Sequence, residues 1–209
     1  MTPVVIWRFL PLTGLALLLA IAFVWRAWLQ RRRHGTWGIL LWRSGSRRQS
    51  LRDSALIVAG ILLGIQAVAA AFWPKSVAVL SVEPPWIEIL RGSGAVLMFG
   101  GLAFLVAAQL DLGASWRIGI DETARPGLVT SGLYRFCRNP IFLGLLLMVA
   151  GYVLLLPTRL SLVLLIGFYI GVRLQTSAEE AWLLRTYGEL YRAYARRVGR
   201  LVPGIGKLR

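Results

Sequence analysis

A glycine-rich segment that carries arginines and leads into an apolar helix is the part of this chain best suited to bind a ligand. It covers residues 127–144 and includes Arg135 and Arg138. Asn139 and Pro140 stand near its end, where asparagine is favoured as a helix cap and proline is tolerated in the first helical turn. The free N–H groups of such a turn, next to guanidinium groups, form a site for an anionic group. We therefore expect a binding site here.

Two adjacent glutamates form the second candidate element. Glu179 and Glu180 are two of only nine acidic residues, and they follow an apolar segment. A carboxylate at that depth in a membrane is costly unless it is paired. The pair could form a capping box with Ser177 or a salt bridge to Arg138 or Arg173. Alternatively, one carboxylate could hold a cationic or hydroxyl-bearing ligand, and the spacing leaves both interpretations open.

Other polar and aromatic residues give weaker indications. Arg138 and Arg197 suit either a lipid phosphate or a substrate anion, which a guanidinium fork binds well. Tyr134 is either an interfacial anchor or the wall of a ligand site. Cys137 has no visible base beside it, so we assign it to packing. His34 is the single histidine of the chain and has no partner ligands nearby, so we expect no metal site.

The composition is that of a membrane protein. Apolar residues make up 57% of the 209 residues and charged residues only 16%. The net charge of +15 lies in the connectors between apolar runs, as the positive-inside rule requires. Because no groove-reading motif accompanies this charge, we exclude nucleic acid as a partner. A single cysteine excludes an internal disulfide framework, and no cleavable signal peptide is evident.

The apolar runs predict an all-α, polytopic membrane protein with five transmembrane helices. The expected spans are residues 9–29, 55–73, 93–110, 141–156 and 160–174. We divide the chain into an N-terminal two-helix region, residues 1–92, and a core, residues 93–209. The core contains three membrane helices, the loop 111–140 and a C-terminal amphipathic helix.

The distribution of positive charge predicts the orientation. Twenty of the 24 Lys and Arg residues fall in the connector 26–52, the loop 111–140 and the tail 173–209. The amino end is therefore expected outside and the loop and tail in the cytoplasm, so that both can build one site that faces the cytoplasm. The basic connector 31–52 is either bound to an anionic membrane surface or a solvated loop.

The tail after Glu180 shows helical periodicity. Apolar residues recur at intervals of three and four, and arginines fall on the other side. This pattern predicts an amphipathic helix that lies against the membrane or folds back over the loop. The apolar positions are Leu183, Tyr187, Leu190, Tyr191, Tyr194 and Val198.

These segments together resemble a known family. The order Leu-Val-Thr-x-Gly-x-Tyr-x-x-x-Arg-Asn-Pro-x-Phe-x-Gly runs from Leu128 to Gly144, and Glu-Glu and Tyr-Gly-x-x-Tyr-x-x-Tyr follow. The pattern resembles the isoprenylcysteine carboxyl methyltransferase family, which is related to the phospholipid methyltransferases. The resemblance covers residues 93–205.

The resemblance implies an integral membrane methyltransferase that uses S-adenosyl-L-methionine. It implies cofactor contacts from the loop, from the start of the following helix and from the paired acids. It also implies basic residues near the reacting carboxylate, here Arg138, Arg197 and Arg173. The implied cofactor-binding residues are Gly127, Leu128, Val129, Tyr134, Asn139, Pro140, Ile141, Phe142, Glu179 and Glu180.

The implied substrate is a membrane-embedded lipophilic acceptor, a small molecule or a lipidated one, with a carboxylate of the isoprenylcysteine type. The prenylcysteine enzymes carry an arginine one turn before the first glutamate, where this chain has Gln175. An amine phospholipid headgroup and a small hydrophobic thiol are therefore also open as acceptors. An NADPH-dependent, sterol-reductase-like enzyme is disfavoured by Ile141 and Leu145, and a non-catalytic membrane scaffold is the remaining class.

Overall fold

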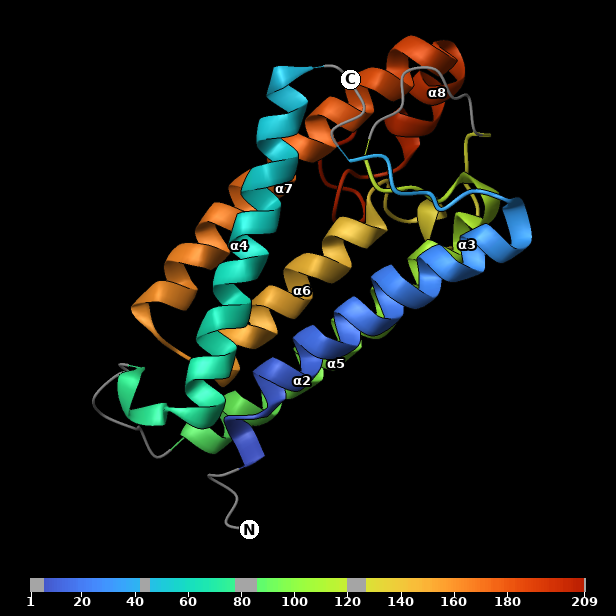
Figure 1. Ribbon diagram of the computed structural model, residues 1–209. Coiled ribbons are helices and arrows are strands. Elements are labelled where there is room, and N and C mark those ends of the chain that lie inside the picture. Colours follow the sequence, from blue (N-terminus) through green and yellow to red (C-terminus); the bar gives the residue numbers. More distant parts are fainter. Residues whose placement is uncertain (1–5, 42–45, 78–85, 120–126, 209) are drawn as a thin grey trace.

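The computed structural model describes residues 6–41, 46–77, 86–119 and 127–208. Within these ranges the chain is built from helices joined by turns, and its β-type pairing is confined to two isolated bridges. Parts of the basic connector, 42–45, and of the loop, 120–126, lie outside the described residues. The described elements confirm the all-α expectation (Figure 1).

Four of the helices are long and apolar enough to cross a membrane. The first, Leu10–His34, comprises α2 (Leu10–Leu17), the π-helix η1 (Leu18–Trp25) and α3 (Arg26–His34). The other three are α4 (Arg47–Phe72), α5 (Ile87–Asp111) and α7 (Arg159–Tyr187). The shorter elements are α6 (Pro140–Leu155), α8 (Glu189–Arg197) and the 3-10 turns η2 (Pro74–Ser76), η3 (Gly113–Ser115) and η4 (Gly132–Arg135).

The number of membrane crossings depends on α6. This helix is apolar but has only 16 residues, which corresponds to roughly 24 Å against a hydrocarbon core of about 30 Å. All five apolar segments expected from the sequence are helical, and four qualify as spans by length. The five-span count and the outside amino end stay predictions.

Glycines bring α5 and α6 unusually close together. A Cβ added at Gly101 would lie 2.9 Å from the carbonyl oxygen of Gly144, and one added at Gly94 would lie 2.9 Å from that of Gly151. The two glycines of α5 are seven residues apart, and so are the two glycines of α6, so the glycines of each helix lie on one face. This contact allows backbone-to-backbone packing, which is how small residues stabilise helix pairs in membranes. The α5–α6 pair is the centre of the bundle.

The core lies between this pair and the helices α4 and α7, which run side by side (Figure 1). It is filled by buried side chains such as Leu63, Met98, Met148, Phe168 and Val172. At the end of the bundle where α6 leads into α7, a capping box between Thr158 and Ser161 starts α7. The short turn and this cap produce an antiparallel α6–α7 hairpin.

Helix α7 continues well past the predicted end at residue 174 and reaches Tyr187. Glu179 and Glu180 therefore lie inside a continuous helix, which excludes the capping box between Ser177 and Glu180 that the sequence left open as one alternative. The chain turns at Gly188, whose φ of 52° favours glycine, and α8 follows. The predicted C-terminal helix is thus split into the end of α7 and α8.

The loop before α6 and the C-terminal tail meet at one end of the bundle (Figure 1). The face of α8 that carries Tyr191, Tyr194 and Ala195 is buried, and it packs against Leu128 of the loop and Leu183 of α7. Of the two placements open from the sequence, α8 folds back over the loop. This arrangement brings the two candidate segments together.

Candidate functional site

An ion pair joins the two segments. The Arg138 Nε donates to Glu180 Oε1 at 3.0 Å, and Nη2 lies 3.0 Å from the same oxygen. The other Arg138 N–H groups donate to the carbonyl oxygens of Ala195 (2.9 Å), Val198 (2.5 Å) and Gly206 (3.0 Å). Four acceptors, Glu180 Oε1 and three backbone carbonyl oxygens, thus take hydrogen bonds from this guanidinium. Arg138 fastens α8 and the tail to the loop.

Glu180 binds three side chains at once. Its Oε2 lies 2.8 Å from Nη2 of Arg200, and its Oε1 also accepts from Nδ2 of Asn139 at 3.0 Å. Asn139 is the N-cap residue of α6 and Pro140 is the first residue of that helix, as the sequence predicts, but the Asn139 side chain makes no cap hydrogen bond. Its Nδ2 donates to Glu180 Oε1 and to the Arg200 carbonyl oxygen.

The residues just before α6 are covered by the tail. The backbone N–H groups of Arg138 and Asn139 donate to the carbonyl oxygens of Gly199 and Arg200, at 2.9 and 3.1 Å. Asn139 and Pro140 are buried, so the helix start does not offer the open anion site that the sequence predicts. Ile141 is half-buried, and Phe142 packs against the apolar core.

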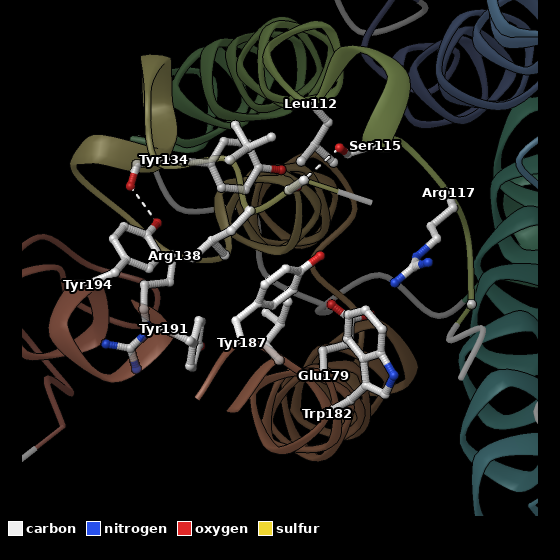
Figure 2. Close-up of a pocket in the computed structure, with 15 residues that line it drawn as sticks. Leu112, Ser115, Arg117, Tyr134, Arg138, Glu179, Trp182, Tyr187, Tyr191 and Tyr194 are labelled. Atoms are coloured by element: carbon white, nitrogen blue, oxygen red, sulfur yellow. Dashed lines mark hydrogen bonds between the residues drawn. The ribbon is translucent and has the colours of Figure 1, made fainter. Parts of the chain in front are cut away.

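The ion pair between Arg138 and Glu180 is called the clamp below. A pocket opens beside it, between the loop, the end of α7 and α8 (Figure 2). Ser115 Oγ donates to the Gly127 carbonyl oxygen at 3.2 Å and joins two parts of its wall. The lining residues are Leu112, Ser115, Arg117, Gly119, Gly127, Leu128, Val129, Tyr134, Arg138, Glu179, Trp182, Leu183, Tyr187, Tyr191 and Tyr194.

Six of the residues singled out from the sequence line this pocket: Gly127, Leu128, Val129, Tyr134, Arg138 and Glu179. The lining does not include Asn139, Pro140, Ile141, Phe142 or Glu180. Arg173 and Arg197 are exposed and also stand outside it. The structure therefore brings the loop and the first glutamate together at the pocket, and it places the second glutamate in the clamp behind it.

Aromatic residues form the part of the wall that sequence reasoning missed. The Trp182 ring lies in the pocket with the Arg117 guanidinium 4.5 Å from its centre, a distance typical of a cation–π contact. Tyr187, Tyr191 and Tyr194 were recognised only as one face of a helix. Their spacing of three and four residues carries the signal, because α8 turns that face onto the loop.

The tyrosine hydroxyls around the pocket differ in whether they have a hydrogen-bond partner among the described residues. The Tyr194 hydroxyl donates to the Tyr134 carbonyl oxygen at 2.6 Å. Burial raises the pKa of both Tyr134 and Tyr194 above the ordinary range, so both stay neutral. The Tyr187 hydroxyl is buried, points into the pocket (Figure 2), and has no hydrogen-bond partner within the described part of the chain. A buried hydroxyl of this kind calls for a ligand or a water.

Glu179 supplies the pocket's carboxylate. It is half-buried, and its Oε1 accepts a hydrogen bond from Gln175 Nε2 at 3.2 Å. The pocket thus offers one carboxylate, the guanidinium of Arg117, several aromatic faces and the backbone of residues 127–129. Such a set suits a ligand that combines a planar ring, hydroxyl groups and a positive centre.

The fold and the site define a class of protein, a helical membrane protein with an aromatic pocket at one end. Comparison with known proteins narrows the class. The family profile described as "Phospholipid methyltransferase" matches residues 90–190. The solved structure of the eukaryotic intramembrane Ras methyltransferase, isoprenylcysteine carboxyl methyltransferase, superposes with a TM-score of 0.66 at 17% identity and covers 100% of this chain and 71% of that one.

Sequence relatives agree with this fold. A methanethiol S-methyltransferase from a Pseudomonas species is 31% identical over 72% of this chain and 57% of its own length. A protein-S-isoprenylcysteine O-methyltransferase from Mus musculus is 28% identical over 64% and 46%. Methanethiol S-methyltransferase 1 from Bradyrhizobium diazoefficiens is 26% identical over 90% and 65%. The chain thus spans about half to two thirds of the length of these relatives.

The chain is similar in sequence and fold to the integral membrane methyltransferases that include the isoprenylcysteine carboxyl methyltransferases and the phospholipid methyltransferases. The resemblance read from the loop and the paired glutamates is confirmed at this level.

Proposed function

We propose that this protein transfers a methyl group from S-adenosyl-L-methionine to a lipophilic acceptor held in the membrane, with the pocket facing the cytoplasm. The observation that carries the proposal is the meeting of the loop, Glu179 and the aromatic face of α8 around one pocket. The names of the relatives and the family profile support methyl transfer as the reaction class.

The residues of the pocket fit this cofactor. The Glu179 carboxylate accepts hydrogen bonds from hydroxyl or ammonium groups, and Arg117 attracts a carboxylate. Aromatic faces such as Tyr134 and Trp182 suit both an adenine ring and a sulfonium cation. The open, buried hydroxyl of Tyr187 gives independent support, because it needs a partner that the described residues do not provide.

The chemistry asks little of the protein beyond positioning. When bound, the cofactor would supply an electrophilic methyl group on a sulfonium, which the acceptor would attack in line, with S-adenosylhomocysteine as the leaving group. The chain holds the two reactants together and keeps water out, which is the main source of acceleration for such a displacement. In our proposal the Arg138–Glu180 clamp closes the aqueous side of the pocket by holding α8 over the loop.

The residues around the pocket also bear on the identity of the acceptor. The family resemblance implies a carboxylate of the isoprenylcysteine type, and such a substrate is best bound by a guanidinium. Gln175 stands where the prenylcysteine enzymes carry an arginine, and Arg173 and Arg197 are exposed. This arrangement favours a small hydrophobic thiol as the second candidate, in line with two of the relatives. The comparisons do not favour an amine headgroup, a reductase or a scaffold.

Methyl transfer from a labelled cofactor tests the proposal. The full chain in lipid nanodiscs is incubated with methyl-labelled S-adenosyl-L-methionine and, separately, an S-prenylated cysteine, a long-chain alkanethiol and phosphatidylethanolamine. We expect label in the prenylcysteine or the thiol. Mild base releases the label from a methyl ester and leaves a thioether intact, which separates the two. Label in none of the acceptors, with folded protein, would contradict the proposal.

A further inference from the structure

A chain of buried amides links the pocket carboxylate to a helix that does not line the pocket. Gln175 Nε2 donates to Glu179 Oε1 at 3.2 Å, and Gln175 Oε1 accepts from Gln49 Nε2 at 3.2 Å. Gln49 lies in the first turn of α4 and is 3% exposed, and Gln175 on α7 is 4% exposed. The chain therefore crosses the α4–α7 contact through the protein interior.

The hydrogen bonds along this chain run in one direction. Gln49 Oε1 accepts from Arg52 Nη2 at 2.6 Å, and Gln49 Nε2 also donates to Asp53 Oδ1 at 2.6 Å. Each amide oxygen thus faces a donor, and each amide nitrogen faces an acceptor. Turning either amide over would place like atoms together, so the neighbours fix both orientations. The end result is an N–H group aimed at Glu179.

The first turn of α4 is itself held in place. Ser46 precedes the helix, and its Oγ accepts from the Gln49 backbone N–H at 3.4 Å as an N-cap. The amide chain is therefore anchored in the capped first turn of α4.

We propose that Gln49 and Gln175 are positioning residues that hold the Glu179 carboxylate in the orientation needed for the cofactor. The inference rests on the proposed function, because it assumes that Glu179 binds S-adenosyl-L-methionine. It also assigns a role in the site to the N-terminal region, residues 1–92, which lies outside residues 93–205, the part of the chain that the family resemblance covers. A carboxylate held in advance binds a ligand more tightly because less freedom is lost on binding.

The affinity for S-adenosylhomocysteine, which the reaction does not consume, tests this role. Calorimetric titration of the full chain in detergent compares the wild type with Gln49→Leu and Gln175→Leu. We expect a loss of affinity of about tenfold for Gln175→Leu and about threefold for Gln49→Leu, since a hydrogen bond to a charged group is replaced by an apolar contact. If Gln175→Leu does not fold, Gln175→Asn breaks the contact by shortening the side chain.

Gln66→Leu is the matched control. Gln66 lies on α4 like Gln49, is also buried, and donates to Thr158 Oγ1 at 2.6 Å, at the end of the bundle where α7 begins and about 20 residues before Glu179 on that helix. The same chemical change there should lower the midpoint of thermal unfolding without changing the affinity. An equal loss of affinity in Gln66→Leu would show a general structural effect and overturn the proposal.

A double-mutant cycle with Glu179→Gln separates positioning from packing. We expect Gln175→Leu to cost less than about twofold in affinity in the Glu179→Gln background, because the carboxylate that it orients is gone. Additive losses would overturn the inference. Wild-type protein that fails to bind would refute the proposed function and the positioning role with it, whereas wild-type binding that Gln175→Leu leaves unchanged would refute the positioning role alone.

Discussion

Arg138 and Glu180 form a buried ion pair, 42 residues apart in the chain, with side chains only 1% and 6% exposed and an Nη2–Oε1 distance of 3.0 Å. Arg200 joins the same carboxylate from the tail at 2.8 Å. Removing one member of a buried pair leaves the other charge without compensation, which costs far more than an exposed pair contributes. The stability of the pocket end should therefore depend on this carboxylate.

The substitution Glu180→Gln tests that dependence. We expect it to lower the free energy of unfolding by about 3–5 kcal/mol, because two guanidinium groups lose their counter-charge. Reversible unfolding in mixed detergent, followed by circular dichroism, measures the loss. Glu189→Gln is the matched control, since the Glu189–Arg192 pair has side chains 75% and 44% exposed. Its effect should stay within about 0.5 kcal/mol, and equal losses in the two variants would contradict the account.

The glycine contact between α5 and α6 gives a second prediction. Gly101→Ala should destabilise the protein by about 1–3 kcal/mol, because the added Cβ meets the Gly144 carbonyl oxygen and the Met148 nitrogen, both at 2.9 Å. Gly100→Ala serves as the control, since nothing lies within 4 Å of its Cβ position. Thermal unfolding of the two variants in the same detergent measures the difference. A Gly101→Ala protein as stable as Gly100→Ala would exclude close backbone packing here.

Two tyrosines of the pocket should respond differently to loss of the hydroxyl. Tyr187→Phe removes a hydroxyl without a partner in the described chain, so it should lower cofactor affinity while stability holds. Tyr194→Phe removes the hydrogen bond to the Tyr134 carbonyl oxygen and should cost about 1 kcal/mol of stability. Calorimetric titration and thermal unfolding of both variants separate the effects. A Tyr187→Phe protein with unchanged affinity would remove the hydroxyl from the ligand site.

The single cysteine should be inert in the folded protein. Cys137 is buried, its Sγ donates to the Leu201 carbonyl oxygen at 2.9 Å, and burial raises its pKa to about 11. At pH 8 the thiolate, which is the reactive form, is therefore scarce. We expect N-ethylmaleimide to label the native protein slowly at pH 8 and to label the unfolded protein fully, as mass spectrometry would show.

The same pKa shift predicts a change of stability with pH. The thiol ionises near its ordinary pKa of about 8.5 in the unfolded chain and near 11 in the folded one. As the pH rises, the unfolded state thus loses the thiol proton before the folded state does. The free energy of unfolding therefore falls as the pH rises from about 9 to 11. Cys137→Ala should remove this part of the alkaline destabilisation, and a wild-type profile identical to that of the variant would argue against a raised pKa.

Much of the fold could be predicted because hydrophobic length is a strong signal. Each predicted apolar segment overlaps a helix, and the 29-residue helix α7 begins one residue before its expected start. Its end could not be decided from the sequence because residues 175–187 mix polar and apolar side chains, and tertiary contacts rather than hydropathy extend the helix. The turn at Gly188 could have been anticipated from the glycine.

The site was predictable only where local sequence decides. Residues 127–129 and Tyr134, for which the resemblance implied cofactor contacts, line the pocket, and their contact with a cofactor stays a prediction. The sequence did not show that Glu179 lines the pocket while Glu180 pairs with arginines, because this depends on which side of α7 faces Arg138 and Arg200. The covering of Asn139 by the tail depends on contacts about 60 residues apart in the chain. Sequence spacing carries no information on such pairings.

The central claim, that Glu179 and the surrounding pocket bind S-adenosyl-L-methionine, is tested most directly by calorimetric titration of the purified full chain and of Glu179→Gln. We predict saturable binding at one site in the wild type and affinity lower by about tenfold or more in Glu179→Gln, with both proteins equally folded. No heat of binding from folded wild-type protein, or equal affinity of the two proteins, would contradict the account.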